Sequence, residues 1–331
     1  MNAARSLLMT CIIFIAQCTH TSQVTTTLPI NKVILWGHKL HSHTHSYIHW
    51  AFHRTFTHLG YDTYWFDNND DVSDFDFSNA LFITEGQVDQ KMPVRNDCFY
   101  ILHNCGRAEY KNLYAQGHAI TLQVYTHDCL RYNLTKLDDC IYYDVKSASI
   151  YMPWATDLLP DEIDENKKNM RPEKRQEIVF IGTVGCGEFG NIEHIGPFKK
   201  AGKENNINFY STMQLSMEEN RARIQSAYMA PAIQGSWQVE KGYIPCRIFK
   251  NISYGAFGIT NSKTVYELFN KKIVYNPDCY QLFYDAKQKL ENFDTNELLE
   301  LMDFVKEKHT YIHRIRDLLW FFESVYESKQ D

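Results

Sequence analysis

Lys241-Gly-Tyr-Ile-Pro-Cys-Arg-Ile-Phe-Lys-Asn-Ile-Ser-Tyr-Gly-Ala-Phe-Gly-Ile-Thr260 is the stretch that decides the fold. It predicts a loop, a helix that begins near Arg247 and, after a glycine turn, a buried apolar strand. Arg247, Lys250 and Asn251 fall in the first turns of that helix. Helix-terminal amides and two cations together form an anion site of diphosphate size. The alternative is an amphipathic helix with its Arg and Lys in solvent, but a strand this apolar does not normally follow such a helix.

Apolar strands and helices alternate along the whole chain. In the first half we predict strands over 32–37, 62–66, 79–84, 98–103 and 119–125, with a helix over 46–59. In the second half we predict strands over 177–182, 207–210, 227–233, 256–260 and 272–275, with helices over 217–226, 247–254 and 264–269. This alternation implies parallel pairing and a doubly wound α/β sheet in each half.

The chain is predicted to form two Rossmann-like domains that face a cleft, because a charged, proline-containing linker separates the two series. The predicted parts are a leader over 1–27, a first domain over 31–150, the linker over 151–176, a second domain over 177–295 and C-terminal helices over 296–331. Ligands of open α/β sheets bind outside the carboxyl ends of the strands, which places the site in the cleft. We expect the last two helices to pack against each other as a pair. Alternatively, the last helix returns to the first domain, as would suit a hinged two-domain cleft.

A glycine-rich loop follows the strand over 177–182. Gly185, Gly187 and Gly190 match the G-x-G-x-x-G pattern of dinucleotide sites. The next strand, Ile207-Asn-Phe-Tyr-Ser211, lacks the acidic residue that would hold a ribose, which disfavours a nicotinamide oxidoreductase. Backbone N–H groups from Gly182 onward could instead face a diphosphate. A flexible connection is the alternative.

The segment from Tyr151 to Phe322 resembles the second half of GT-B glycosyltransferases, especially the CgeB-like, group 1 branch. The matching elements occur in family order: Tyr151-Met-Pro-Trp-Ala-Thr-Asp157, the strand with Gly182, Pro245 before Arg247-Ile-Phe249, Gly255-Ala-Phe before Thr260, Glu267-Leu-Phe269, and His309-Thr-Tyr-Ile-His-Arg314. The first domain matches in architecture only, so it does not identify the acceptor.

The resemblance implies a metal-independent glycosyltransferase of hexosyltransferase type. The second domain would grip a nucleotide-diphosphate sugar as substrate, without a further cofactor, and the first would admit the acceptor. The predicted donor-binding residues are Gly182, Thr183, Tyr243, Arg247, Lys250 and Asn251.

The sequence departs from the family pattern at two positions of the site. The family usually has Glu where this chain has Lys250, and the other acidic position of the Glu-x7-Glu pattern falls at Gly242. A lysine that faces phosphate would stabilise the leaving diphosphate. Loss of both carboxylates makes a catalytically inactive nucleotide- or carbohydrate-binding protein the alternative function.

Histidines crowd the start of the first domain. Seven of the fourteen are His38, His41, His43, His45, His49, His53 and His58. A neutral histidine can accept the proton of an acceptor hydroxyl, and His38 and His41 follow the strand end at the cleft. They are the predicted catalytic bases, whereas His49, His53 and His58 are assigned to packing. A metal site is the less favoured alternative, because GT-B enzymes do not need one and no carboxylate completes the set.

The net charge of the chain and its N-terminal segment limit the classes of partner that we expect. The 331 residues carry 34 basic and 40 acidic side chains, a net charge of -6, with no long basic block. This disfavours a nucleic-acid partner and leaves a glycan, lipid or protein acceptor open.

Residues 1–5 are positively charged and residues 7–16 are apolar, as in a secretory leader that is too short to span a bilayer. We expect peripheral membrane contact or entry into the secretory pathway, with the cytoplasm, where nucleotide sugars are made, as the alternative.

Overall fold

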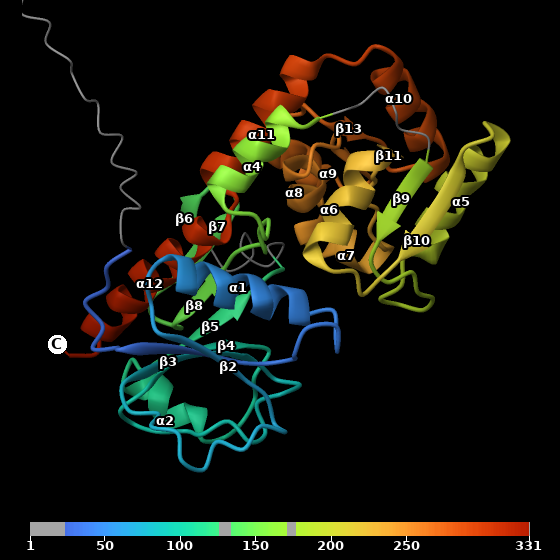
Figure 1. Ribbon diagram of the computed structural model, residues 1–331. Helices are drawn as coiled ribbons and strands as arrows, with labels where there is room; N and C mark the ends of the chain where they lie inside the picture. The colour runs from blue at the N-terminus through green and yellow to red at the C-terminus, as the bar shows by residue number, and fades with distance from the viewer. Residues whose placement is uncertain (1–23, 126–133, 171–176, 331) are drawn as a thin grey trace, which may run out of the picture.

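The computed structural model describes residues 24–125, 134–170 and 177–330, and it contains two α/β lobes connected by helices (Figure 1). The first lobe is built on an eight-stranded sheet of order β2-β1-β3-β4-β5-β8-β7-β6. The second is built on a three-stranded sheet, β10-β9-β11, and a two-stranded sheet, β12-β13. A bridge between Ala232 and Thr260 joins these two smaller sheets.

The first sheet confirms the parallel pairing that the alternation predicts. Strands β1 to β5 and β8 pair in parallel, whereas β6 and β7 add an antiparallel edge that the sequence analysis missed. Each of these edge strands has 4 residues, β6 is largely exposed and only Ile141 of β7 is buried, so neither has the apolar run that marks a buried strand. The strands are β1 (Lys32–Trp36), β2 (Thr63–Phe66), β3 (Ala80–Glu85), β4 (Phe99–His103), β5 (Ala119–Gln123), β6 (Thr135–Asp138), β7 (Ile141–Asp144) and β8 (Ser149–Tyr151).

Helices cover both faces of this sheet. Helix α1 (Ser46–His58) lies on one face and α2 (Tyr110–Ala115) on the other (Figure 1). The last helix, α12 (Tyr311–Glu327), lies beside α1 rather than with the second lobe. The rings of Phe52 and Tyr311 meet edge to face at 4.8 Å in this contact. The chain therefore crosses between the lobes twice, once through the linker and once before α12.

The predicted linker contains a helix of its own. Helix α4 (Pro160–Lys168) begins with a proline, and the Glu162 carboxylate accepts the Leu159 backbone N–H at 2.8 Å. It lies along α11 (Thr295–Lys308). Lys306 of α11 forms an ion pair with Asp164 of α4 at 2.9 Å. The two crossings thus pack against each other.

The second lobe repeats the order of the first five strands. Its strands β10, β9 and β11 pair in parallel, and the bridge at Ala232 continues the series to β12 and β13. The strands are β9 (Glu177–Ile181), β10 (Asn208–Thr212), β11 (Ala227–Met229), β12 (Ile259–Thr260) and β13 (Val274–Tyr275). The helices are α5 (Ile192–Glu204), α6 (Met217–Ser226), α7 (Ser236–Glu240), α8 (Cys246–Ser253), α9 (Lys263–Leu268) and α10 (Cys279–Glu291).

Most of the predicted leader lies outside the described residues, and its targeting role stays a prediction. The part that is described contacts the first lobe: Tyr61 donates to the Val24 carbonyl at 2.7 Å, and the Thr26 hydroxyl donates to Glu323 at 2.7 Å. In the described ranges, no helix has the length and apolar character to cross a membrane.

A carboxyl group on α12 supplies a stability prediction. Burial raises the pKa of Asp317 to about 6, although Arg314 and Arg316 oppose the shift. Because the folded pKa lies above the unfolded one, the carboxylate costs stability increasingly from about pH 4 to pH 6 and fully above that. We expect Asp317→Asn to raise the free energy of unfolding by about 1–2 kcal/mol at pH 7.5 and to change little at pH 4. Urea denaturation at the two pH values measures the difference, and an equal effect at both would contradict the assignment.

Candidate functional site

Both lobes have a topological switch point at the carboxyl edge of the sheet. In the first lobe β1 lies between β2 and β3, and in the second β9 lies between β10 and β11. The connections that leave β1 and β9 therefore diverge from those of the next strand, which opens a space at the strand ends. The two predicted parts of the site, the histidine loop and the glycine-rich loop, follow β1 and β9 directly.

The histidine loop, residues 37–45, is shaped by the first residue of α1. The hydroxyl of Ser46 donates to the His43 carbonyl at 2.6 Å and accepts the backbone N–H of His41 at 3.2 Å. His41 takes a left-handed backbone conformation with φ 68°. Its exposed ring lies 3.1 Å from the Tyr47 hydroxyl. The loop therefore has a defined turn, with His41 on its outer side.

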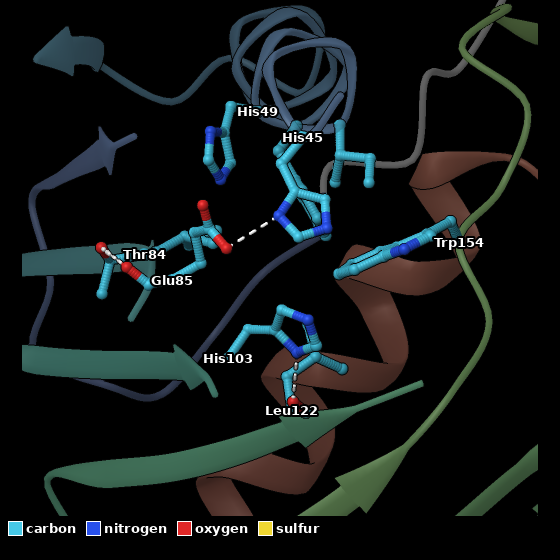
Figure 2. Close-up of a pocket in the computed structure, with 10 residues that line it drawn as sticks. His45, His49, Thr84, Glu85, His103, Leu122 and Trp154 are labelled. Carbon is cyan, nitrogen blue, oxygen red and sulfur yellow. Dashed lines mark hydrogen bonds and ion pairs between the residues drawn. The ribbon is translucent and has the colours of Figure 1, made fainter. Parts of the chain in front are cut away.

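Glu85 is the group on which the histidines converge. It is the last residue of β3, and only 2% of its surface is exposed. One carboxylate oxygen lies 2.6 Å from His38 Nε2 and the other lies 2.7 Å from His45 Nδ1, the contact drawn in Figure 2. Burial alone would raise the pKa of this carboxyl, but the hydrogen bond from His45 and the charges of His45, His38 and His49 lower it to about 2. The glutamate is thus a buried carboxylate between two imidazoles.

A small cavity lies beside this carboxylate. His45, His49, His103 and Trp154 surround it in Figure 2, and its volume of about 10 Å³ is room for one water-sized group. His103 ends β4, and its Nδ1–H donates to the Leu122 carbonyl at 2.9 Å, so this nitrogen carries the proton. Burial lowers the pKa of His49 to about 3, which leaves its imidazole neutral.

The second edge is built around Arg247. Its Nε donates to the carbonyl of Ile181, the last residue of β9, at 2.8 Å, and its guanidinium lies over the Phe180 ring at 4.1 Å. In the described part of the chain this side chain forms no ion pair, although it is half-buried. An arginine held in this way keeps its charge available for an anion.

Gly182 allows the arginine to lie where it does. A Cβ on this residue would lie 2.1 Å from Arg247 Nη2, and the backbone has φ 140°. Both the close approach and the conformation require glycine. The structure therefore brings together Gly182 and Arg247, two predicted donor-binding residues that are 65 positions apart in the sequence.

The rest of the glycine-rich loop is fixed by Asn191. Its side chain accepts the Gly185 N–H at 3.1 Å and donates to the Thr183 carbonyl at 3.1 Å. Gly190 packs closely on the loop, since a Cβ there would lie 2.3 Å from the Gly185 carbonyl oxygen. Thr183 is exposed at the loop surface. The loop is thus an ordered turn rather than a flexible connection.

Lys250 has a partner that the sequence analysis missed. Its Nζ lies 2.9 Å from Asp157, and both side chains are largely buried, with 12% and 6% exposed. The Tyr254 hydroxyl donates to the same carboxylate at 2.7 Å. Asp157 belongs to the linker motif, so the pair connects α8 to the crossing between the lobes. The charge of Lys250 is compensated, which distinguishes it from Arg247.

Two further predicted donor residues have structural partners. Asn251 is 3% exposed and donates to the Ala230 carbonyl at 2.8 Å, so its side chain lies in the interior. Tyr243 forms an antiparallel bridge with Tyr125 of the first lobe, and their rings are 5.7 Å apart. Burial raises the pKa of the Tyr243 hydroxyl, which therefore stays protonated.

The two edges lie next to each other. Gln214, just after β10, donates to the His41 carbonyl at 3.0 Å, and its neighbour Thr212 accepts the Gly182 N–H at 2.9 Å. On the other side, Lys250 Nζ lies 5.7 Å from the centre of the Tyr47 ring in α1. The histidine loop of the first lobe thus borders the edge that holds Gly182 and Arg247.

The fold is a GT-B-like one, with two Rossmann-like lobes. Among solved structures, an α-glucosyltransferase in complex with UDP matches with a TM-score of 0.53 and 9% identity, over 87% of this chain and 99% of that one. The DNA-modifying enzyme β-glucosyltransferase, studied with and without uridine diphosphoglucose, has a TM-score of 0.46 and 10% identity, over 90% and 99%. No family profile and no curated protein sequence matches the chain. At these identities the similarity establishes the fold and leaves the reaction to be argued from the site.

The expectation that no carboxylate accompanies the histidines is wrong, because Glu85 lies among them. It is 40 residues from His45 in the sequence, and only the pairing of β1 with β3 brings the two together. A signal was present, since an acidic residue directly follows the apolar strand predicted over 79–84. The same holds for Asp157, the one acidic residue of the linker motif.

Proposed function

We propose that this protein transfers a sugar from a nucleotide-diphosphate sugar to an acceptor that enters beside the histidine loop. The single observation that carries the proposal is the guanidinium of Arg247, which lies against Gly182 at the carboxyl end of β9 and has no ion-pair partner among the described residues. A diphosphate needs charge-assisted donors, and it binds where backbone N–H groups and a cation converge at a strand end. The resemblance to GT-B glycosyltransferases supports a site between the two lobes, with the donor on the second.

The finer parts of the proposal rest on the sequence. The similarity to the CgeB-like branch, the independence of the transfer from metal, and the roles of Thr183, Tyr243, Lys250 and Asn251 toward the donor stay predictions. Of the two predicted bases, His38 has the better support, because Glu85 holds its ring, whereas His41 is exposed and contacts no carboxylate among the described residues. The chemical class of the acceptor stays open among glycan, lipid and protein.

A titration series followed by a turnover assay tests the proposal. We expect UDP or another nucleoside diphosphate to bind more tightly than its nucleoside, and one sugar nucleotide of a panel to be hydrolysed slowly in a single turnover without acceptor. Binding without any turnover would support the alternative, a catalytically inactive nucleotide-binding protein. Failure to bind UDP, GDP and CMP would reject the proposed donor site, and binding of NAD instead would indicate an oxidoreductase.

A further inference from the structure

Three side chains at the carboxyl edge of the first sheet present ligand atoms to a common point. His38 and His43 of the histidine loop and Glu85 of β3 each offer one nitrogen or oxygen, and these atoms all lie within 4.8 Å of one another. The two imidazoles stack with their centres 4.1 Å apart. We propose that His38, His43 and Glu85 bind one divalent transition-metal ion, with Zn²⁺ as the best match.

The donor set decides the class of metal. Two imidazoles and one carboxylate suit Zn²⁺ and its neighbours, whereas Mg²⁺ and Ca²⁺ prefer oxygen ligands throughout. Ligand atoms that share a tetrahedral Zn²⁺ at about 2.0–2.1 Å are about 3.3 Å apart, so the most distant pair of ligand atoms needs to close by at most about 1.5 Å, whereas His38 Nε2 and the Glu85 oxygen, now 2.6 Å apart, need to open by about 0.7 Å. The two histidines lie on a loop and are partly exposed, so their side chains can make such an adjustment while the buried Glu85 stays in place.

Which nitrogen of His43 would bind the ion depends on the position of the ring proton. The His45 backbone N–H donates to His43 Nδ1 at 3.3 Å, so Nδ1 carries a lone pair and Nε2 is the nitrogen that faces away from the loop backbone. If Nε2 binds the ion, the ring proton has to move to Nδ1 and the contact from the His45 N–H has to open. If Nδ1 binds the ion instead, the same contact opens and the proton stays on Nε2. His38 already presents Nε2 to Glu85 at 2.6 Å, where an ion would replace the shared proton.

The surroundings resemble those of a supported site. His45 binds the second oxygen of Glu85 at 2.7 Å and so orients the carboxylate, as hydrogen-bond partners of metal ligands do. Ser46 holds the loop at the His43 carbonyl. Three protein ligands leave a fourth position open, which an oxygen of water or of a substrate hydroxyl could occupy.

The metal assignment is independent of the proposed transfer reaction, because it is tested by metal content rather than by turnover. It does compete with the predicted role of His38 as a base, since a nitrogen that binds the ion has no free lone pair for a proton.

Full-length protein without a histidine tag is freed of metal with EDTA and titrated with Zn²⁺ in a calorimeter. A parallel titration with Co²⁺ follows the visible absorption of the bound ion. We expect one ion per chain, with affinity lowered by at least about 10–100-fold in His43→Asn and in Glu85→Gln. His58→Ala is the matched control, because His58 is exposed at the end of α1 and away from the three ligands, and it should bind like the parent.

Thermal unfolding keeps the test decisive if Glu85→Gln fails to fold. Zn²⁺ should raise the melting temperature of the parent and of His58→Ala but not that of His43→Asn, whose side chain lies in a partly exposed loop. Absence of stoichiometric binding to the parent, or equal binding by parent and His43→Asn, would overturn the proposal. In that case His38 and Glu85 are a hydrogen-bonded pair, and the base assignment stands alone.

Discussion

Arg247→Ala is expected to weaken UDP binding by about 10–150-fold while leaving uridine binding nearly unchanged. A charge-assisted hydrogen bond to a phosphate contributes about 1.5–3 kcal/mol, and in the described chain Arg247 has no acidic partner that shares its charge. Nucleoside contacts do not involve this charge, so the loss should be confined to ligands that carry the diphosphate. Isothermal titration with UDP and with uridine measures both affinities.

Two further variants separate loss of charge from loss of structure. Arg223→Ala is the matched control, since Arg223 is an exposed arginine of the same lobe whose guanidinium lies over the Tyr210 ring. Gly182→Ala keeps the arginine but places a methyl group at the position now taken by Nη2, in a backbone conformation that alanine rarely adopts. It should weaken UDP binding as well. If Arg247→Ala binds UDP and uridine like the parent, the donor site lies elsewhere and the similarity reports the fold alone.

The alternation of strands and helices was enough to predict the elements that build the two edges. Helix α1 was expected over 46–59 and is observed over Ser46–His58, and α8 was expected over 247–254 and is observed over Cys246–Ser253. These segments carry a strong apolar periodicity with clear ends, so local sequence determines them. Parallel order then follows from right-handed connections between neighbouring strands.

Contacts between distant segments could not be predicted in the same way. Glu85 meets His38 only because β1 and β3 are neighbours, and Asp157 meets Lys250 only because the linker passes α8. The local pattern marks Glu85, directly after an apolar strand, and Asp157, at the end of the linker motif, but it does not say which residue each of them meets. Gly182 and Arg247 are the exception, because a resemblance to a known family predicts that both lie at one site, and the structure brings the two residues side by side.

The structure changes what the Lys250 substitution is expected to do. Lys250→Ala should lower the free energy of unfolding by about 3–5 kcal/mol, because it leaves the Asp157 carboxylate buried without its cation. Lys250→Glu, which restores the residue usual in the resembling family, should be worse at neutral pH, since it puts two carboxylates together in a site from which water is largely excluded. Urea denaturation of the single variants, with Lys263→Ala as an exposed control lysine, measures these losses.

A double replacement then tests whether Lys250 also serves the donor. Lys250→Met combined with Asp157→Asn removes both charges, and the side-chain carbonyl of the new asparagine can still accept the hydrogen bond from the Tyr254 hydroxyl. The double variant should therefore recover most of the stability that Lys250→Ala loses. If Lys250 only connects α8 to the linker, this folded variant will bind UDP as tightly as the parent. If Lys250 contributes to the phosphate site, UDP affinity will fall while uridine affinity does not. The buried ion pair at 2.9 Å favours the first outcome, because a lysine whose charge is already compensated has less to offer a second anion.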